Sequence, residues 1–327
     1  MNLSTQINGF LTFKNCLSSE ILANLEAKLI LMPTFFYKPI DRKNFLRKSV
    51  QLAGLATLGV SYFRTHAQAR EEAHFALLSD THIAADPENN YRGFYPHRQL
   101  LDIVPQVKKS RPEGILINGD VARLVGDKDD YFNVKKLLEP LAADAPIHMS
   151  MGNHDDRQNF QSVFPTEEQK NPVKDKHISI IETEPVRILM LDTLLYVNKV
   201  AGLLGEQQRE WLSSYLASSD DKPTLLFVHH TLGNGDTDLL DANRMFDIVR
   251  PHKQVKAVFY GHSHRYHIEE SDGLYLINLP AVGYNFDDTQ PTGWLDARFT
   301  GSGATFTLHT NGGNQAGDGK STEVRWK

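Results

Sequence analysis

The sequence lacks several features that would place it in a specialised class. It has one cysteine, Cys16, which excludes a disulfide scaffold, a zinc-finger protein and an iron–sulfur protein. No apolar run reaches the roughly 18 residues that a membrane-spanning helix needs. The formal net charge is −5 and no basic block is present, whereas nucleic-acid binders gain affinity largely by neutralising phosphates. We therefore expect no nucleic-acid partner and no membrane span.

What is present is the composition of an ordinary globular protein. Of the 327 residues, 40% are hydrophobic and 23% are charged, which is enough for a sizeable core. Roughly 100–200 residues per domain is usual, so the length allows one large domain or two modest ones. Because residues 70–327 contain no repeat and no linker, we treat them as one domain. The pattern carries no signal for an oligomeric state.

The first 69 residues have the layout of an export leader. A basic stretch at 42–48 precedes a mildly apolar run at 50–63 and then Ala67-Gln68-Ala69, the order typical of a secretory signal peptide. The stretch resembles a twin-arginine signal in which Lys43 occupies the place of the second arginine. Met32 would give a leader of ordinary length. We therefore predict that residues 1–69 are a leader with a mis-assigned start, and that the protein is periplasmic or extracellular.

An alternative interpretation of this region is an N-terminal helical extension. Residues 20–31 place Ile21, Leu22, Leu25 and Leu29 at helical spacing. In that case the protein would be cytoplasmic.

Residues 70–327 alternate between strand and helix patterns. Short apolar runs predict strands at 75–79, 114–118, 147–151, 178–181, 188–191, 225–228, 255–260 and 274–278. Helical spacing predicts helices at 98–107, where we expect Pro105 to cause a kink, and at 130–141 and 206–216. Strand-like alternation continues from Trp294 into a tail rich in Gly and Asn. Alternation of this kind indicates an α/β layered fold.

Five of the predicted strands end directly in Asp, Asn or His residues. The five blocks are Leu77-Leu78-Ser79-Asp80-Thr81-His82, Ile117-Asn118-Gly119-Asp120, Met151-Gly152-Asn153-His154-Asp155, Phe227-Val228-His229-His230 and Tyr260-Gly261-His262-Ser263-His264. Ligands favour the crevice at the carboxyl ends of strands in α/β sheets. The blocks are therefore expected to converge on one cavity.

The residue types in these blocks suit divalent metal ions. Carboxylate and amide groups supply oxygen, imidazoles supply nitrogen, and no thiolate is present. Asp80-x-His82 and His262-x-His264 each place two side chains on the same side of an extended segment. The glycines before Asp120, Asn153 and His262 permit the turns that end each strand abruptly. Gathering these groups without a cation would be costly, so the pattern predicts a metal site.

The ordered series of blocks resembles the binuclear metallophosphoesterase family, also called calcineurin-like. The family signature runs Asp-x-His, Gly-Asp, Gly-Asn-His-Asp or Glu, a His after a strand, and Gly-His-x-His, and all five blocks occur here in that order. His229-His230 is similar to the class III cyclic-nucleotide phosphodiesterase-type branch. Purple acid phosphatases have a tyrosine ligand where this chain has Arg123. The branch motif continues with two prolines where this chain has Thr231 and Leu232, in a loop that borders the substrate.

The resemblance implies a fold and a role for each matching residue. The fold would be a four-layer α/β/β/α sandwich of two mixed sheets flanked by helices. One metal would be held by Asp80, His82 and His264, the other by Asn153, His229 and His262, with Asp120 bridging both. His154 would face the substrate without binding metal, and Asp155 would orient it.

The implied reaction is hydrolysis of a small phosphate ester, either a phosphodiester or a small phosphomonoester. Two divalent ions, with Mn, Fe or Zn expected, would supply a metal-bound hydroxide that attacks phosphorus. His154 would stabilise the phosphoryl oxygens or protonate the leaving group. One alternative is a non-catalytic metal-binding or sensor protein on the same fold. A nuclease is a further alternative, against which the missing basic groove argues.

Some residues near the blocks have two interpretations. His230 either lines the pocket or packs in the interior. Tyr91 and His97 either face solvent or touch the substrate, and the turn at 284–286, Tyr-Asn-Phe, either lines the pocket or lies outside it.

Overall fold

The computed structural model describes residues 71–165 and 171–327. The predicted export leader, residues 1–69, lies outside the described residues and stays a prediction. None of the helices within 71–165 and 171–327 combines the length and hydropathy that a membrane span requires.

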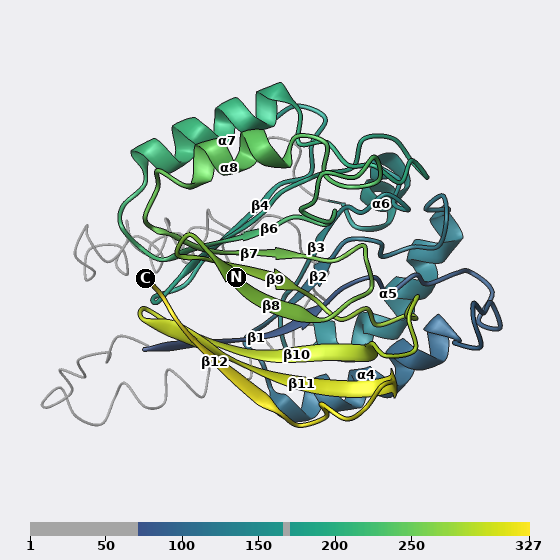
Figure 1. The fold of residues 1–327 in the computed structure, drawn as a ribbon. Helices are drawn as coiled ribbons and strands as arrows, with labels where there is room; N and C mark the ends of the chain where they lie inside the picture. The colour runs from purple at the N-terminus through teal and green to yellow at the C-terminus, as the bar shows by residue number, and fades with distance from the viewer. Residues whose placement is uncertain (1–70, 166–170) are drawn as a thin grey trace, which may run out of the picture. The chain divides into compact units, whose positions relative to one another are not determined.

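Two six-stranded mixed sheets form the centre of the fold (Figure 1). The first has the order β12-β11-β10-β1-β2-β3, with bounds Ser321–Arg325, Gly303–Gly313, Pro291–Thr300, Glu72–Leu78, Gly114–Asn118 and Ile147–Ser150. The second has the order β4-β5-β6-β7-β9-β8, with bounds Ser179–Glu182, Arg187–Met190, Thr224–Phe227, Val255–Tyr260, Leu274–Asn278 and His267–Ser271. Parallel pairing joins β1, β2 and β3 in one sheet and β5, β6, β7 and β9 in the other.

Helices cover the outer face of each sheet. The first sheet carries α4 (Pro96–Ser110), α5 (Lys128–Ala142) and α6 (Arg157–Val163), and the second carries α7 (Glu206–Ser218) and α8 (Ala242–Val249). The helical face of α4 is Leu100, Ile103, Val104 and Val107, whose spacing places all four on the side toward the sheet. These layers confirm the predicted four-layer α/β/β/α sandwich.

A third apolar cluster lies between the two sheets. Its members come from the inner faces of both, and the rings of Phe227 and Phe259 stack within it at 4.3 Å. Phe299 and Phe306 of the first sheet pack against Phe259 edge-on. Each fully buried phenylalanine contributes about 1.5–3 kcal/mol of hydrophobic stabilisation. The inter-sheet contact therefore fixes how the two sheets lie on each other.

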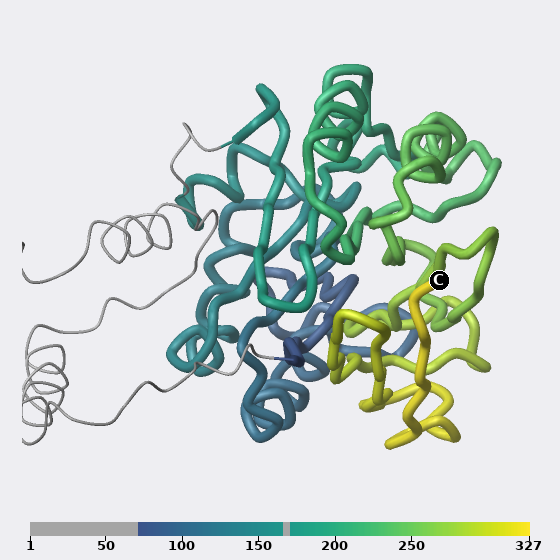
Figure 2. The backbone as a smooth tube through the Cα atoms, turned by 90° about the vertical axis from the view of Figure 1, so that its left-hand side faces the viewer, coloured from purple at the N-terminus to yellow at the C-terminus, as the bar shows by residue number. Residues whose placement is uncertain are grey.

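The predicted strands and helices are all present, and the differences have physical reasons. The helix α4 continues through Pro105 because that residue lies on the exposed face, where the carbonyl that loses its partner can reach water. The two short helices α6 and α8 and the exposed, polar strand β8 were not predicted. The C-terminal alternation is a set of three strands, β10, β11 and β12. Figure 2 shows these strands (yellow) from the side, and β10 pairs with β1.

Candidate metal centre

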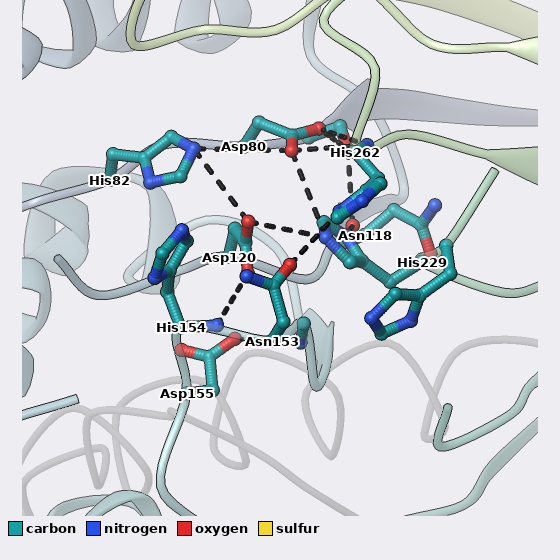
Figure 3. Close-up of polar contacts among 12 residues, drawn as sticks. Asp80, His82, Asn118, Asp120, Asn153, His154, Asp155, His229 and His262 are labelled. Carbon is teal, nitrogen blue, oxygen red and sulfur yellow. Dashed lines mark hydrogen bonds and ion pairs between the residues drawn. The ribbon is translucent and has the colours of Figure 1, made fainter. Parts of the chain in front are cut away.

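The five polar blocks meet at one edge of the two sheets. Asp80, Asp120 and Asn153 follow β1, β2 and β3 of the first sheet. His229 and His262 follow β6 and β7 of the second sheet. Figure 3 shows these side chains pointing toward one another. The convergence arises because the carboxyl ends of parallel strands lie at the same edge of each sheet and the two edges adjoin.

The side chains form three overlapping groups, and within each group the ligand atoms lie within 4.8 Å of one another. The groups are Asp80, His82 and His264; His82, Asp120 and His154; and Asp120, His229 and His262. The first and third correspond to the two predicted metal sites, and the second places Asp120 of the third group beside His82 of the first, as a bridging ligand would lie.

The distances between ligand atoms fit shared cations. Two ligands of one divalent ion, at bonds of about 2.0–2.2 Å and near a right angle, lie about 3 Å apart. In the first group His82 Nε2 lies 3.1 Å from His264 Nε2, which lies 3.3 Å from an oxygen of Asp80. In the other, His229 Nε2 lies 3.2 Å from an oxygen of Asp120. His262 Nδ1 lies 2.9 Å from Oδ1 of Asn153. Two facing imidazole nitrogens and an imidazole beside a carboxylate are arrangements that a cation stabilises.

The backbone at these residues is unusual. Five of the predicted ligands have a positive φ, between 46° and 67°: Asp80, His82, Asp120, His262 and His264. Such angles are uncommon outside glycine, and strained backbone concentrates at functional sites. Hydrogen bonds support the turns, including those from the amides of Asp80 and His82 to the carbonyls of Gly119 and Asp120. The chain thus turns each side chain inward immediately after its strand.

Two glycines are required by close packing against the candidate ligands. A Cβ at Gly152 would overlap the backbone nitrogen and a carboxylate oxygen of Asp120. At Gly119, where φ is +77°, a Cβ would overlap the ring of His229. Gly152 is therefore explained by space rather than by the turn that the sequence suggested.

Backbone carbonyls fix the orientation of two imidazoles. His229 Nδ1 donates to the carbonyl of Asn118 at 2.8 Å, and His264 Nδ1 donates to that of Tyr284 at 2.6 Å. In each neutral ring this leaves Nε2 as the lone-pair nitrogen. Metal-binding histidines in proteins commonly have such a partner on their second nitrogen, which sets the tautomer and strengthens the ligand.

The charges of the cluster balance one another in the absence of a cation. Burial would raise the pKa of Asp80, but the neighbouring His264 and His229 lower it to about 2. Burial would lower the pKa of His229, but the carboxylates of Asp120 and Asp80 raise it to about 10. The pKa of Asp120 is likewise held well below its ordinary value, mainly by His229 against the effect of burial. A proton on His229 therefore occupies the place of a cation, and these residues fit a divalent metal ion.

His154 lies at the edge of the cluster. One of its ring nitrogens is within 4.8 Å of the ligand atoms of His82 and Asp120. Its Nδ1 lies 2.7 Å from the carbonyl of Leu124, and its amide donates to Asp120 at 2.9 Å. The ring is thus held between the cluster and solvent, beside Asp120 (Figure 3).

The structure gives Asp155 a different task from the one that the resemblance implied. Among the described residues, its carboxylate accepts hydrogen bonds from the amides of Val121, Ala122 and Gly152 at 2.9–3.2 Å and from the hydroxyl of Tyr131 at 3.0 Å, rather than from the ring of His154. Three backbone donors satisfy a buried carboxylate better than one ring could. Asp155 ties the loop after β2 to the loop after β3, so the prediction that it contacts and orients His154 is corrected.

Two residues that sequence reasoning missed hold the site in place. The side chain of Asn118 donates to the carbonyl of Val228 at 2.8 Å, which joins the two sheets beside the cluster. Asp192 is buried after β5 and accepts two hydrogen bonds of 2.7 Å from Arg157. Asp192 gave the same signal as the five blocks, an acidic residue directly after an apolar strand, but outside any motif.

The structure also resolves the residues with two interpretations. His230 is buried, with Nδ1 2.8 Å from the hydroxyl of Thr193. His97 contacts Asn133 rather than the cluster. Tyr284 and Phe286 do border the cluster, with ring centroids 4.6 and 4.3 Å from that of His264.

Comparison with known proteins identifies the family. The sequence model described as calcineurin-like phosphoesterase matches residues 73–266. The chain belongs to the calcineurin-like phosphoesterase family. Together with the buried Asp and His cluster, this membership identifies it as a metal-dependent phosphoric ester hydrolase.

Two curated relatives show the range of this similarity. A probable glycerophosphodiester phosphodiesterase from Arcobacter nitrofigilis is 30% identical over 198 residues, covering 58% of this chain and 70% of that protein. A 3′,5′-cyclic adenosine monophosphate phosphodiesterase from Pseudomonas aeruginosa is 27% identical over 255 residues, covering 76% of this chain and 89% of that protein. These names agree with the class III branch that the motifs predicted.

A solved structure confirms the fold of this calcineurin-like phosphoesterase. A dimetal phosphatase from Danio rerio superposes with a TM-score of 0.61 at 17% identity, covering 78% of this chain and 99% of that one. At this identity the likeness concerns the fold alone.

Proposed function

We propose that this protein is a binuclear-metal phosphodiesterase acting on a small phosphodiester. The observation that carries the proposal is the position of Asp120 between two ligand groups: one oxygen of Asp120 lies 3.7 Å from Nε2 of His82 in the first group and 3.2 Å from Nε2 of His229 in the other. The names of both curated relatives favour a diester over a monoester. The compact chain without a basic stripe favours a small substrate over a nucleic acid.

In this proposal each metal ion has its own set of ligands. Asp80, His82 and His264 would hold one ion, Asn153, His229 and His262 would hold the other, and Asp120 would bind both. Oxygen and imidazole ligands without thiolate suit Mn, Fe or Zn. When bound, such a pair supplies Lewis acidity and a water molecule that ionises near neutral pH.

The residues around the ions position and stabilise the substrate. His154 reaches the cluster from its solvent-facing edge, where its second ring nitrogen, when the ring carries both protons, can donate to a phosphoryl oxygen or to the leaving-group oxygen. The Leu124 carbonyl orients the ring of His154, and the hydrogen bond from the backbone amide of His154 to the Asp120 carboxylate fixes its backbone. Asp155 keeps the two loops that carry Asp120 and His154 at a constant distance.

Metal analysis combined with a substrate panel tests this function. The purified protein is loaded with Mn²⁺ or Zn²⁺, its metal content is measured, and hydrolysis of bis(4-nitrophenyl) phosphate, a cyclic nucleotide, a glycerophosphodiester and 4-nitrophenyl phosphate is compared. We expect two ions per chain and faster hydrolysis of the diesters than of the monoester. A metal-loaded protein that hydrolyses none of them would support a sensor instead. A chain that takes up no ion would refute the proposed centre.

We also propose that the protein is exported. The support is the order of basic stretch, apolar run and Ala-x-Ala within residues 42–69. Mass spectrometry of the mature N-terminus tests this, and we expect material beginning near Arg70. A protein that keeps its N-terminal residues in the cytoplasm would support the helical-extension alternative.

A further inference from the structure

Exposed apolar side chains concentrate at the edge that carries the metal centre. Among the described residues, ten large apolar side chains are exposed, and Leu101 and Phe132 are the two that lie on helices α4 and α5. The other eight lie in the loops that follow β1, β2, β5, β6 and β9: Tyr91, Leu124, Val125, Tyr196, Val197, Val200, Leu240 and Phe286. Apolar surface gathered in one place marks a binding region.

Three aromatic rings form the part of this region that contacts the cluster. Tyr284 is buried, and its ring lies 4.7 Å from that of His82 and stacks on it. Tyr91 lies 4.8 Å from Tyr284 and is 40% exposed. Phe286 lies 4.3 Å from the His264 ring at an interplanar angle of 31°, and is 49% exposed. We call Tyr91, Tyr284 and Phe286 the aromatic shelf.

A positive charge completes the shelf. The guanidinium of Arg123 lies 5.9 Å from the ring centroids of both Tyr91 and Tyr284. It comes three residues after Asp120, and its Nε donates to Asn89 at 3.3 Å. Guanidinium groups over aromatic faces are attracted by the ring quadrupole, and they also attract the oxygens of phosphate esters.

The position of the shelf constrains the substituent on a bound phosphate. A phosphate held among Asp80, His82 and His264 would lie next to Phe286, because that ring covers His264 directly. One ester substituent would then extend over the exposed faces of Phe286 and Tyr91. Flat aromatic groups gain from offset or edge-to-face contact with such rings, whereas a glycerol group has no π face to offer.

We propose that the aromatic shelf with Arg123 binds a flat aromatic substituent of the phosphodiester, such as a nucleobase or another aryl group. This inference rests on the proposed function and adds the substrate class. It assigns specificity to Phe286 and Tyr91, which are too exposed to serve the core. The buried Tyr284 supports both the shelf and the two imidazoles beneath it.

Calorimetric binding of two matched product-like ligands tests the shelf. The Mn²⁺-loaded protein is titrated with adenosine 5′-monophosphate and with ribose 5-phosphate, which share the phosphate and the sugar and differ in the base. We expect adenosine monophosphate to bind roughly tenfold more tightly, and the Phe286→Ala variant to remove most of that difference. Phe132→Ala, which removes an equally exposed ring on α5, is the control and leaves both affinities unchanged.

Further variants and ligands separate the possible causes. Phe286→Leu keeps an apolar side chain without a ring, and we expect it to lose the preference as Phe286→Ala does; a preference that survives in Phe286→Leu would overturn stacking. A third ligand, 4-nitrophenyl phosphate, distinguishes a site for any aryl group from a site for nucleobases. A general aryl site binds it more tightly than ribose 5-phosphate, and a nucleobase site does not. If the protein hydrolyses diesters but binds adenosine 5′-monophosphate and ribose 5-phosphate equally well, the proposed role of the aromatic shelf is refuted and the proposed function is not. A protein that hydrolyses no diester would refute the proposed function, and the shelf with it.

Discussion

Metal loading and the protonation of His229 compete for the same atom. In the metal-free chain burial would lower the pKa of His229, but Asp120 and Asp80 raise it to about 10, so the ring carries a proton at pH 7. Its Nδ1 faces the carbonyl of Asn118, which leaves Nε2 as the nitrogen that a metal would bind. A cation must therefore displace the Nε2 proton, and we predict that loading releases it.

The size of this effect follows from the pKa. Removing a proton from a group with a pKa of about 10 at pH 7 costs about 4 kcal/mol, at about 1.4 kcal/mol for each pH unit. The apparent affinity of the site should then rise about tenfold per pH unit between pH 6 and pH 9. His262 and Asp80 add little, since burial lowers the pKa of His262 to about 4 and the pKa of Asp80 is about 2, so both already have the form that binds metal.

Calorimetry in two buffers of different ionisation enthalpy counts the protons that are released. At pH 6, where a metal-bound water with a pKa of about 7 keeps its proton, we expect about one proton per chain. His230→Gln is the matched control, because burial holds the pKa of His230 well below its ordinary value, so that its ring is already neutral before metal is added. That variant should still release about one proton, and His229→Gln should release almost none. A count near zero in the unaltered protein would refute this account of the cluster.

Four more predictions follow from the geometry. Asp120→Asn should abolish nearly all turnover, because the carboxylate that lies beside a ligand of each set is lost; kcat and metal content are measured together, and full activity would contradict the bridging role. His154→Ala should leave metal content unchanged while kcat falls about 10²–10⁴-fold, and a loss of metal would show instead that His154 is a ligand. Gly152→Ala should reduce metal content without unfolding the chain, because the added Cβ overlaps Asp120; elemental analysis and circular dichroism check this, and normal loading would contradict it. In the metal-free protein, burial and the Asp120 charge raise the pKa of Asp155 from 3.8 to about 6. The protonated carboxyl therefore contributes about 3 kcal/mol to the free energy of unfolding below pH 4, and this contribution is lost as the pH rises through 6. Denaturant titrations at several pH values should show this loss of stability in the unaltered protein and not in Asp155→Asn.

The sequence was informative where a short apolar run met a chemically distinctive residue. All eight predicted strands formed because each run is bounded by turn residues or by a polar block, and the blocks identified the edge of the sheet that carries the cluster. The helices α4, α5 and α7 were recognisable from helical spacing over three turns or more. Helices α6 and α8 span two turns, too few for their periodicity to stand out.

Hydrogen bonds between residues far apart in the chain could not be predicted from the sequence. Asp155 follows His154 directly, yet its carboxylate binds amides after β2, a pairing that depends on how two loops pack. Asn118 reaches Val228, 110 residues away in the chain and in the other sheet. Such contacts follow from the arrangement of the sheets, which residue type and spacing do not encode.

The link that Asn118 makes between the sheets has a consequence for the whole interior. The ligand atoms come from two separate layers, so any slip of one layer over the other changes the size of the cage that they form. The edge-on contacts of Phe259 with Phe299 and Phe306 set that alignment, although these rings lie in the interior between the sheets. We therefore expect metal selectivity to depend partly on interior packing, so that substitutions remote from every ligand change which ion fits.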